Sequence, residues 1–147
     1  MKNQVWQRCL EIAEEQMTSL ESMMIELRKS AANEGKSTAG DKHETALAMV
    51  QIEQEQLQRQ INIVQSQLNQ LHAVRALDVS ETVQAGSLLN TDQGLFYICT
   101  GIGKLNVEGK ELLCISPTAP LASSFLGKKK NDVVFFNRRA FRILDIS

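Results

Sequence analysis

Two runs of mainly apolar residues, each with the alternating spacing of 4 and 3 that is typical of a coiled coil, constrain this chain more than any other feature. The first run is Trp6, Leu10, Ala13, Met17, Leu20, Met24, Leu27 and Ala31. The second is Leu47, Val50, Gln54, Leu57, Ile61, Val64, Leu68 and Leu71. When the runs are paired in opposite directions, the two residue numbers of every pair add up to 77 or 78. This pattern predicts two antiparallel helices that fold back near residue 39.

The segment between the two runs is polar and contains Gly35 and Gly40. We therefore expect helices over residues 2–32 and 41–77, with the tip of the hairpin within residues 33–44. At 1.5 Å per residue, a helix of about 30 residues makes an arm roughly 45 Å long. Gln54 is the one strongly polar position of the seam, opposite Met24, and we interpret it as a contact that sets the register.

After residue 77 the pattern changes to short β-type runs separated by turn residues. Strands are expected at residues 83–89, 95–100, 104–107, 110–115, 132–136 and 140–146. Turns are expected at residues 90–94, 108–109 and 137–138, and a short helix at residues 120–126 should end at Gly127. The sequence therefore predicts an α+β protein: a coiled-coil hairpin over residues 1–77, followed by a small, mostly antiparallel β domain with one helix over residues 78–147.

Composition excludes several classes of function. The net charge of −1 argues against bulk coating of nucleic acid, which needs a strong positive excess. The cysteines at 9, 99 and 114 are far apart and show no C-x-x-C spacing, so neither structural zinc nor a disulfide framework is expected. No apolar run approaches 18 residues, and residues 1–4 open directly into the first helix. We expect a cytoplasmic protein without a membrane segment.

Asp41 and Glu44 are the main candidate site residues. At i and i+3 in the first turn of the second helix their side chains share a face, so both carboxylates can reach one hard cation. Two carboxylates alone hold Mg²⁺ poorly, and another molecule would have to supply the remaining oxygens. The same spacing is also that of a capping box, which starts a helix without any metal, and the two interpretations are compatible. His43 beside them is interpreted as a solvated residue.

The remaining motifs give weaker indications of function. Residues 101–104 have glycines followed by a lysine, as a phosphate-binding loop does. They lack the five-residue segment that leads into such a loop, the Ser or Thr after the lysine and the following helix. No nucleophile triad or cofactor motif is present, so the chain is not expected to be an enzyme by itself. Six basic residues could form a patch if the last hairpin brings them together, or simply a solvated face. They are Lys128, Lys129, Lys130, Arg138, Arg139 and Arg142.

These features together resemble the bacterial Gre family of transcript cleavage factors, over nearly the whole chain. Residues 40–48 keep the glycine, both acids and the alanine of the family's tip motif, although His43, Thr45, Leu47 and Ala48 depart from it. Residues 115–122, 125–128 and 131–134 are similar, without a gap, to the family's later motif. Departures within that motif are Thr118 and Ala119.

The resemblance implies an FKBP-like fold for residues 78–147 and docking of that domain on the rim of the secondary channel of RNA polymerase. The docking residues would be Thr118, Ala119, Pro120 and Leu121. The hairpin would enter the channel, where Asp41 and Glu44 would complete the coordination of a Mg²⁺ ion shared with the polymerase. The polymerase would then hydrolyse the 3′ end of a backtracked nascent RNA. The chain would bind no cofactor alone.

Two other functions remain open. A regulator of the same shape could occupy the channel without supporting cleavage, which the changed residues around the tip permit. Alternatively, the chain could be a plain protein-interaction module or a prolyl isomerase, although no aromatic-lined proline pocket is evident in the sequence. The complementary seam within one chain favours a monomer.

Overall fold

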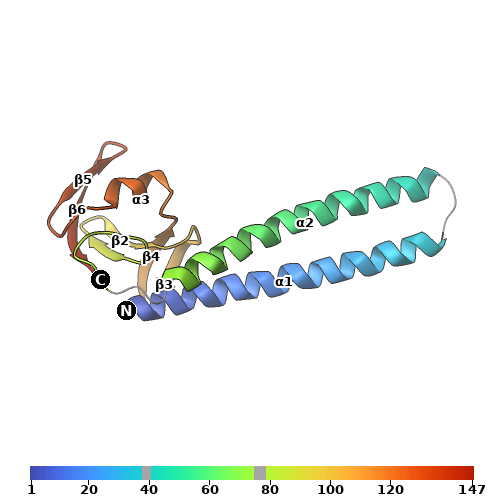
Figure 1. Cartoon of the computed structure of the whole chain (residues 1–147), viewed down its shortest axis with the longest axis horizontal. Helices are drawn as coiled ribbons and strands as arrows, with labels where there is room; N and C mark the ends of the chain where they lie inside the picture. Colours follow the sequence, from blue (N-terminus) through green and yellow to red (C-terminus); the bar gives the residue numbers. More distant parts are fainter. Residues whose placement is uncertain (38–40, 75–78) are drawn as a thin grey trace. The chain divides into compact units, whose positions relative to one another are not determined.

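Two long helices precede a six-stranded sheet that carries one short helix (Figure 1). The computed structural model describes the backbone of residues 1–37, 41–74 and 79–147, and the side chains outside residues 34–43 and 75–78. The helices are α1 (Lys2–Ser37), α2 (Asp41–Val74) and α3 (Pro120–Phe125). The strands are β1 (Leu88–Thr91), β2 (Gly94–Ile98), β3 (Gly103–Val107), β4 (Lys110–Ile115), β5 (Val133–Phe136) and β6 (Arg139–Ile146). The predicted α+β class is confirmed.

The chain separates into two compact units, residues 12–68 and residues 1–11 together with 69–147. In the first unit α1 and α2 run antiparallel and side by side (Figure 1). Their buried apolar residues fall on predicted seam positions: Ala13, Leu20, Met24 and Val64. The remaining seam positions of this unit, such as Leu27 and Leu57, are half-buried. The predicted seam is therefore the packed face of the hairpin, and only some of its side chains are fully buried.

The second unit contains the paired ends of both helices. Val5, Trp6, Cys9 and Leu71 are all buried within it. The indole Nε1 of Trp6 donates a 2.7 Å hydrogen bond to the carbonyl oxygen of Leu71. These two residues form the last pair of the predicted antiparallel register, which is confirmed at this end.

The sheet has the strand order β3-β4-β2-β1-β6-β5, and every neighbouring pair is antiparallel except β2 and β4. Its core cluster lies where α3 packs against the sheet. The members are Val83, Leu89, Phe96, Ile98, Ala122, Phe125, Val134, Phe141 and Ile143. Phe96, Phe125 and Phe141 pack against one another with ring centroids 5.5 to 5.9 Å apart, one pair tilted and two pairs edge to face. Burial of three aromatic rings supplies much of the stabilisation of so small a domain.

Two of the predicted turns are tight hairpin turns. Glu108 and Gly109 connect β3 to β4, and Asn137 and Arg138 connect β5 to β6. All four residues have positive φ, between 49° and 77°. Two-residue loops of this kind match the right-handed twist of antiparallel strands, which explains why both hairpins close there.

Two predicted boundaries differ from the structure by several residues. The strand expected at residues 83–89 is wrong, because β1 comprises Leu88–Thr91 and Gly86 has a φ of +92°. Val83 instead donates to the carbonyl of Lys128 and accepts from the amide of Gly127, so residues after α3 satisfy its backbone. The helix α1 continues to Ser37, five residues beyond the predicted end, since a single glycine costs a helix only about 1 kcal/mol. For the second helix, predicted to reach residue 77, residues 75–77 lie outside the described part.

Candidate functional site

The acidic tip begins with the first residue of α2, which is Asp41. Glu44, in the first turn of that helix, is exposed. The side chains of Asp41 and His43 lie outside the described residues. A carboxylate and a partner one turn away on a helix are chemically suited to Mg²⁺, which prefers oxygen ligands.

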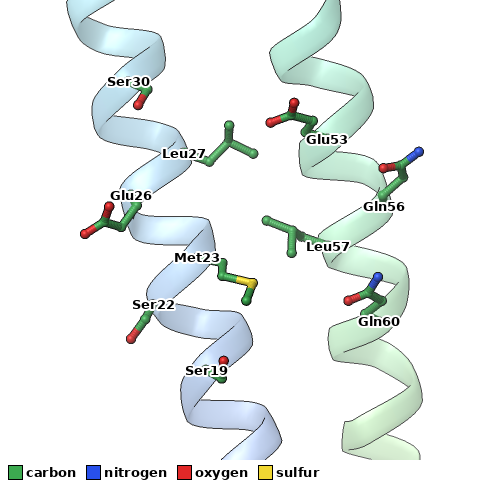
Figure 2. Close-up of a pocket in the computed structure, with 10 residues that line it drawn as sticks. All are labelled: Ser19, Ser22, Met23, Glu26, Leu27, Ser30, Glu53, Gln56, Leu57 and Gln60. Carbon is green, nitrogen blue, oxygen red and sulfur yellow. The ribbon is translucent and has the colours of Figure 1, made fainter.

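A cavity of about 670 Å³ lies between the two helices within residues 12–68 (Figure 2). Leu27 and Leu57 point toward one another across it, and Met23 points into the gap (Figure 2). Serine, glutamate and glutamine line the rest: Ser19, Ser22, Glu26, Ser30, Glu53, Gln56 and Gln60. Met23 is 52% exposed, so the apolar floor of this cavity is open to solvent. This cavity could not be predicted from the sequence, because the seam pattern indicates which residues face the partner helix but not how far apart the two helices lie.

Gln54 lines a second cavity of this unit, of about 480 Å³, together with Met24 and Arg28. It is half-buried, while Met24 is buried. The predicted proximity of Gln54 and Met24 is thus reproduced. The register-setting role of this polar side chain stays a prediction.

Cysteines that are distant in the sequence meet in the second unit. The Cys9 Sγ donates to the Cys114 Sγ at 3.6 Å, and the Cys114 Sγ donates to the carbonyl of Thr100 at 3.0 Å. All three cysteines are free and buried. The spacing of the sequence could not show this, since α1 and β4 are brought together only by packing. The cluster is a structural contact between a helix and the sheet.

The environment of this cluster favours neutral thiols on two of its members. The hydrogen bond to Cys114, together with burial, raises the pKa of Cys9, and the same bond lowers the pKa of Cys114. Burial raises the pKa of Cys99 to about 12 and also raises the pKa of Tyr97. A reactive cysteine needs an accessible thiolate, so this cluster does not have the character of a nucleophile site.

The segment expected to dock on a partner connects β4 to α3. Ser116 and Thr118 share a hydrogen bond of 2.9 Å between their hydroxyls, and the amide of Ala119 donates to the carbonyl of Ser116 at 3.0 Å. Pro120 is the first residue of α3, a position where its missing N–H costs nothing. Thr118 and Pro120 are exposed, whereas Ala119 and Leu121 are half-buried and pack against the core cluster. Two of the four predicted docking residues are therefore well exposed, on a segment that the other two anchor.

The six basic residues are all exposed. Lys128, Lys129 and Lys130 follow α3, and Lys130 pairs with Asp145 at 3.9 Å. The other three lie on the β5–β6 hairpin, where Arg139 is opposite Phe136 and Arg142 opposite Val133. Residues at odd spacing along a strand point to opposite faces of a sheet. Arg139 and Arg142 thus lie on different faces, so the basic residues surround the hairpin instead of sharing one flat patch.

A further hollow, of about 550 Å³, lies over β2 and β4. Its lining includes Phe96 and Phe141, with Arg139 and the pair Lys104 and Glu111, whose charged groups are 3.7 Å apart. This aromatic-lined hollow was not evident from the sequence, because its members come from four different strands. Both rings are nearly buried in the core, so only their edges face the hollow.

Among the residues that the structure describes, no group of three or more His, Cys, Asp or Glu side chains is placed to hold a metal ion. No helix among those residues is both long and apolar enough to cross a membrane.

The fold and site define the chain as a helical hairpin joined to a six-stranded mixed sheet. No family model matches it, and neither a curated protein nor a solved structure is significantly similar to it.

Proposed function

We propose that this chain is a Gre-like transcription elongation factor, which binds the secondary channel of RNA polymerase and stimulates cleavage of backtracked nascent RNA. It would act as a monomer in the cytoplasm, and the hydrolytic activity would belong to the polymerase. The proposal combines the resemblance of the tip and docking motifs with the architecture of the chain.

The observation that carries the proposal is the position of the acidic pair on a long helix. Asp41 is the first residue of α2, and Glu44 is exposed one turn later. At 1.5 Å per residue, the 34 residues of α2 extend over about 51 Å. Helices of this length suit a narrow channel, because two packed helices are slender and present their turn first.

The acids would act by completing a site that another protein mainly provides. Asp41 and Glu44 would offer carboxylate oxygens to a Mg²⁺ ion held by the polymerase, which would polarise the RNA phosphate and lower the pKa of an attacking water. The chain's own contribution is to position these oxygens and to orient that water by hydrogen bonding. Glu44 is exposed, so its carboxylate is accessible to an ion that another protein holds.

Docking would depend on the segment between β4 and α3. Thr118 and Pro120 offer an exposed polar and an exposed apolar contact. The half-buried Ala119 and Leu121 hold the segment against the core, so that it loses little conformational freedom on binding.

A cleavage assay tests the proposal. The purified chain is added with Mg²⁺ to a backtracked elongation complex whose RNA carries a label at the 5′ end. We expect the chain to shorten the RNA at its 3′ end, with at least a tenfold lower rate for Glu44→Gln and Asp41→Asn. The matched control is Glu55→Gln, an exposed acid three turns further along α2, which should cleave like the wild type. Equal cleavage by all variants, or none by the wild type, would overturn the proposal.

A channel regulator that does not support cleavage is the second candidate. The residues that surround the acids, His43, Thr45, Leu47 and Ala48, differ from the family motif. If their geometry does not support cleavage, the chain will still compete with other channel ligands and change the rate of initiation or elongation. The same assay separates the two candidates, because the regulator produces no new RNA ends.

A further inference from the structure

The strand β5 (Val133–Phe136) lies at one edge of the sheet. Its backbone bonding to β6 can be traced from both ends. Asn131 donates to the carbonyl of Ile143, and Ile143 donates to the carbonyl of Asp132. At the other end the strands meet in the two-residue turn of Asn137 and Arg138.

Antiparallel pairs alternate between those that exchange hydrogen bonds and those that do not. Counting from both ends, Val134 with Phe141 and Phe136 with Arg139 are the bonded pairs of this hairpin. The N–H and C=O groups of Val133 and Phe135 therefore point away from β6, toward the open side of β5. Such an edge is a ready template for another strand.

The side chains along this edge are apolar and uncovered. Phe135 is 76% exposed and Val133 is 40% exposed. Leu144 on β6 is 41% exposed. We call these three residues the edge patch. Val134 and Phe141, which point to the other face, belong to the buried core cluster, so the exposure of the edge patch follows from strand alternation.

The opposite edge of the sheet shows the usual protection. Leu105 and Val107 of β3 are buried, and Lys104 of that strand pairs with Glu111 of β4 at 3.7 Å. The four residues of β5 carry no charge. Natural edges are generally blunted by charges or covered, so the edge patch has the character of a surface that a partner covers.

Charge identifies the kind of partner. Residues 128–145 contain six basic and two acidic side chains, a net charge of +4, in a chain whose net charge is −1. Arg142 lies opposite Val133, beside the edge patch. Two copies of this positive hairpin would repel each other, which disfavours pairing between identical edges. A negatively charged partner would be attracted.

We propose that the edge of β5 and the edge patch bind an extended acidic peptide segment of another protein, which adds to the sheet as a seventh strand. Its backbone would pair with Val133 and Phe135. Because Val133, Phe135 and Arg142 lie on one face of the sheet, apolar and acidic side chains that take turns along that same face of the peptide would cover Phe135 and meet Arg142. Single-stranded nucleic acid is less suited to this surface. One exposed ring between aliphatic side chains is not a stacking platform, and phosphates cannot extend a sheet. This inference does not depend on the hairpin tip.

The test uses the full chain and a synthetic peptide that repeats valine, serine, aspartate and serine, so that its valines and aspartates share one face of the strand. Binding is followed by calorimetry. Two further peptides have the same sequence but carry methyl groups on alternate backbone nitrogens, one on the odd-numbered and the other on the even-numbered residues. In one of the two, the methylated nitrogens face β5 and prevent pairing as a strand. A fourth peptide replaces every aspartate by lysine. Variants of the chain are Phe135→Ser and Arg142→Glu, both at exposed positions, and the control is Lys110→Glu at the distant β3–β4 turn.

We expect the acidic peptide to bind, with the affinity roughly tenfold lower for Phe135→Ser and for Arg142→Glu and unchanged for Lys110→Glu. At least one of the two methylated peptides should not bind, and the lysine peptide should not bind either. Binding should slow hydrogen exchange at the amides of Val133 and Phe135. The proposal is overturned if both methylated peptides bind as tightly as the unmethylated acidic peptide. It is also overturned if only a single-stranded oligonucleotide binds and the same variants weaken that binding. A dimer in sedimentation that Phe135→Ser dissociates would overturn it as well.

Discussion

The indole Nε1 of Trp6 donates a 2.7 Å hydrogen bond to the carbonyl oxygen of Leu71. This oxygen belongs to the last described turn of α2 (Asp41–Val74). Trp6 is 5% exposed and Leu71 is fully buried, so water cannot easily replace the bond. A residue near the start of α1 thus bonds to the last described turn of α2 and fixes the relative register of the two helices there.

Replacing Trp6 by phenylalanine should destabilise the chain. The ring still fills most of the space, but the buried carbonyl of Leu71 loses its partner, at a cost of about 1–3 kcal/mol. Urea denaturation followed by circular dichroism measures the change. The control is Gln7→Ala at the adjacent exposed position, which should remain within about 0.5 kcal/mol of the wild type. Equal stability of the phenylalanine variant and the wild type would show that the bond contributes nothing.

The thiols of Cys9 and Cys114 should form a disulfide slowly on prolonged exposure to diamide, which takes up both thiol hydrogens and reaches these buried thiols only when the chain opens locally. Their sulfur atoms are 3.6 Å apart, so a small movement brings them to bonding distance. Intact mass should fall by two hydrogens, and peptide mapping should join residues 9 and 114. Cys99→Ser should retain this product and Cys9→Ser should lose it. A product that joins Cys99 instead would contradict the packing of α1 on β4.

Alkaline pH should destabilise the chain partly through Cys99. Its pKa is raised from 9.0 to about 12, so the folded state favours the neutral thiol more than the unfolded state does. This contribution is fully present below pH 9 and is lost as the pH rises toward 12. Between pH 7 and pH 10 the wild type should therefore lose about 1.4 kcal/mol more than Cys99→Ser. The losses due to Cys9 and Tyr97 remain in both proteins, and parallel pH profiles would disprove the assignment to Cys99.

Gln54→Leu should stabilise the hairpin. Gln54 is half-buried beside Met24, and a leucine there would bury more apolar surface, worth about 1 kcal/mol. The denaturation midpoint should rise, whereas Gln51→Leu, at an exposed position of the same helix, should leave it unchanged. A lower midpoint for Gln54→Leu would mean that its amide makes a necessary polar contact.

The hairpin was predictable because its information is periodic. Apolar residues at a fixed spacing identify the packed face, and the constant sum of paired numbers fixes the register, as the contact of Trp6 with Leu71 confirms. The short sheet was less predictable at its start. Val83 favours a strand through its β-branched side chain, but it bonds to residues after α3, a long-range contact that no local pattern reports.

The candidate site was predictable only as residue types. The spacing of Asp41 and Glu44 indicates a shared helical face, and the structure adds that Glu44 is exposed. The open cavity around Leu27 and Leu57 and the exposed edge of β5 depend on how elements meet, so neither could be read from the sequence. Strand alternation alone would have predicted that Val133 and Phe135 share a face, but not that this face lacks a cover.

The most direct measurement places the tip in a transcription complex. Glu44→Cys carries a tethered iron chelate, which cuts nearby nucleic acid through hydroxyl radicals, and Glu108→Cys in the β3–β4 turn carries the same group as a control. In a backtracked complex, we predict that the chelate at position 44 cuts the nascent RNA close to the polymerase active centre and that the chelate at position 108 does not. Absence of cutting from position 44, with the chain bound to the polymerase, would contradict the placement of the acidic tip in the channel.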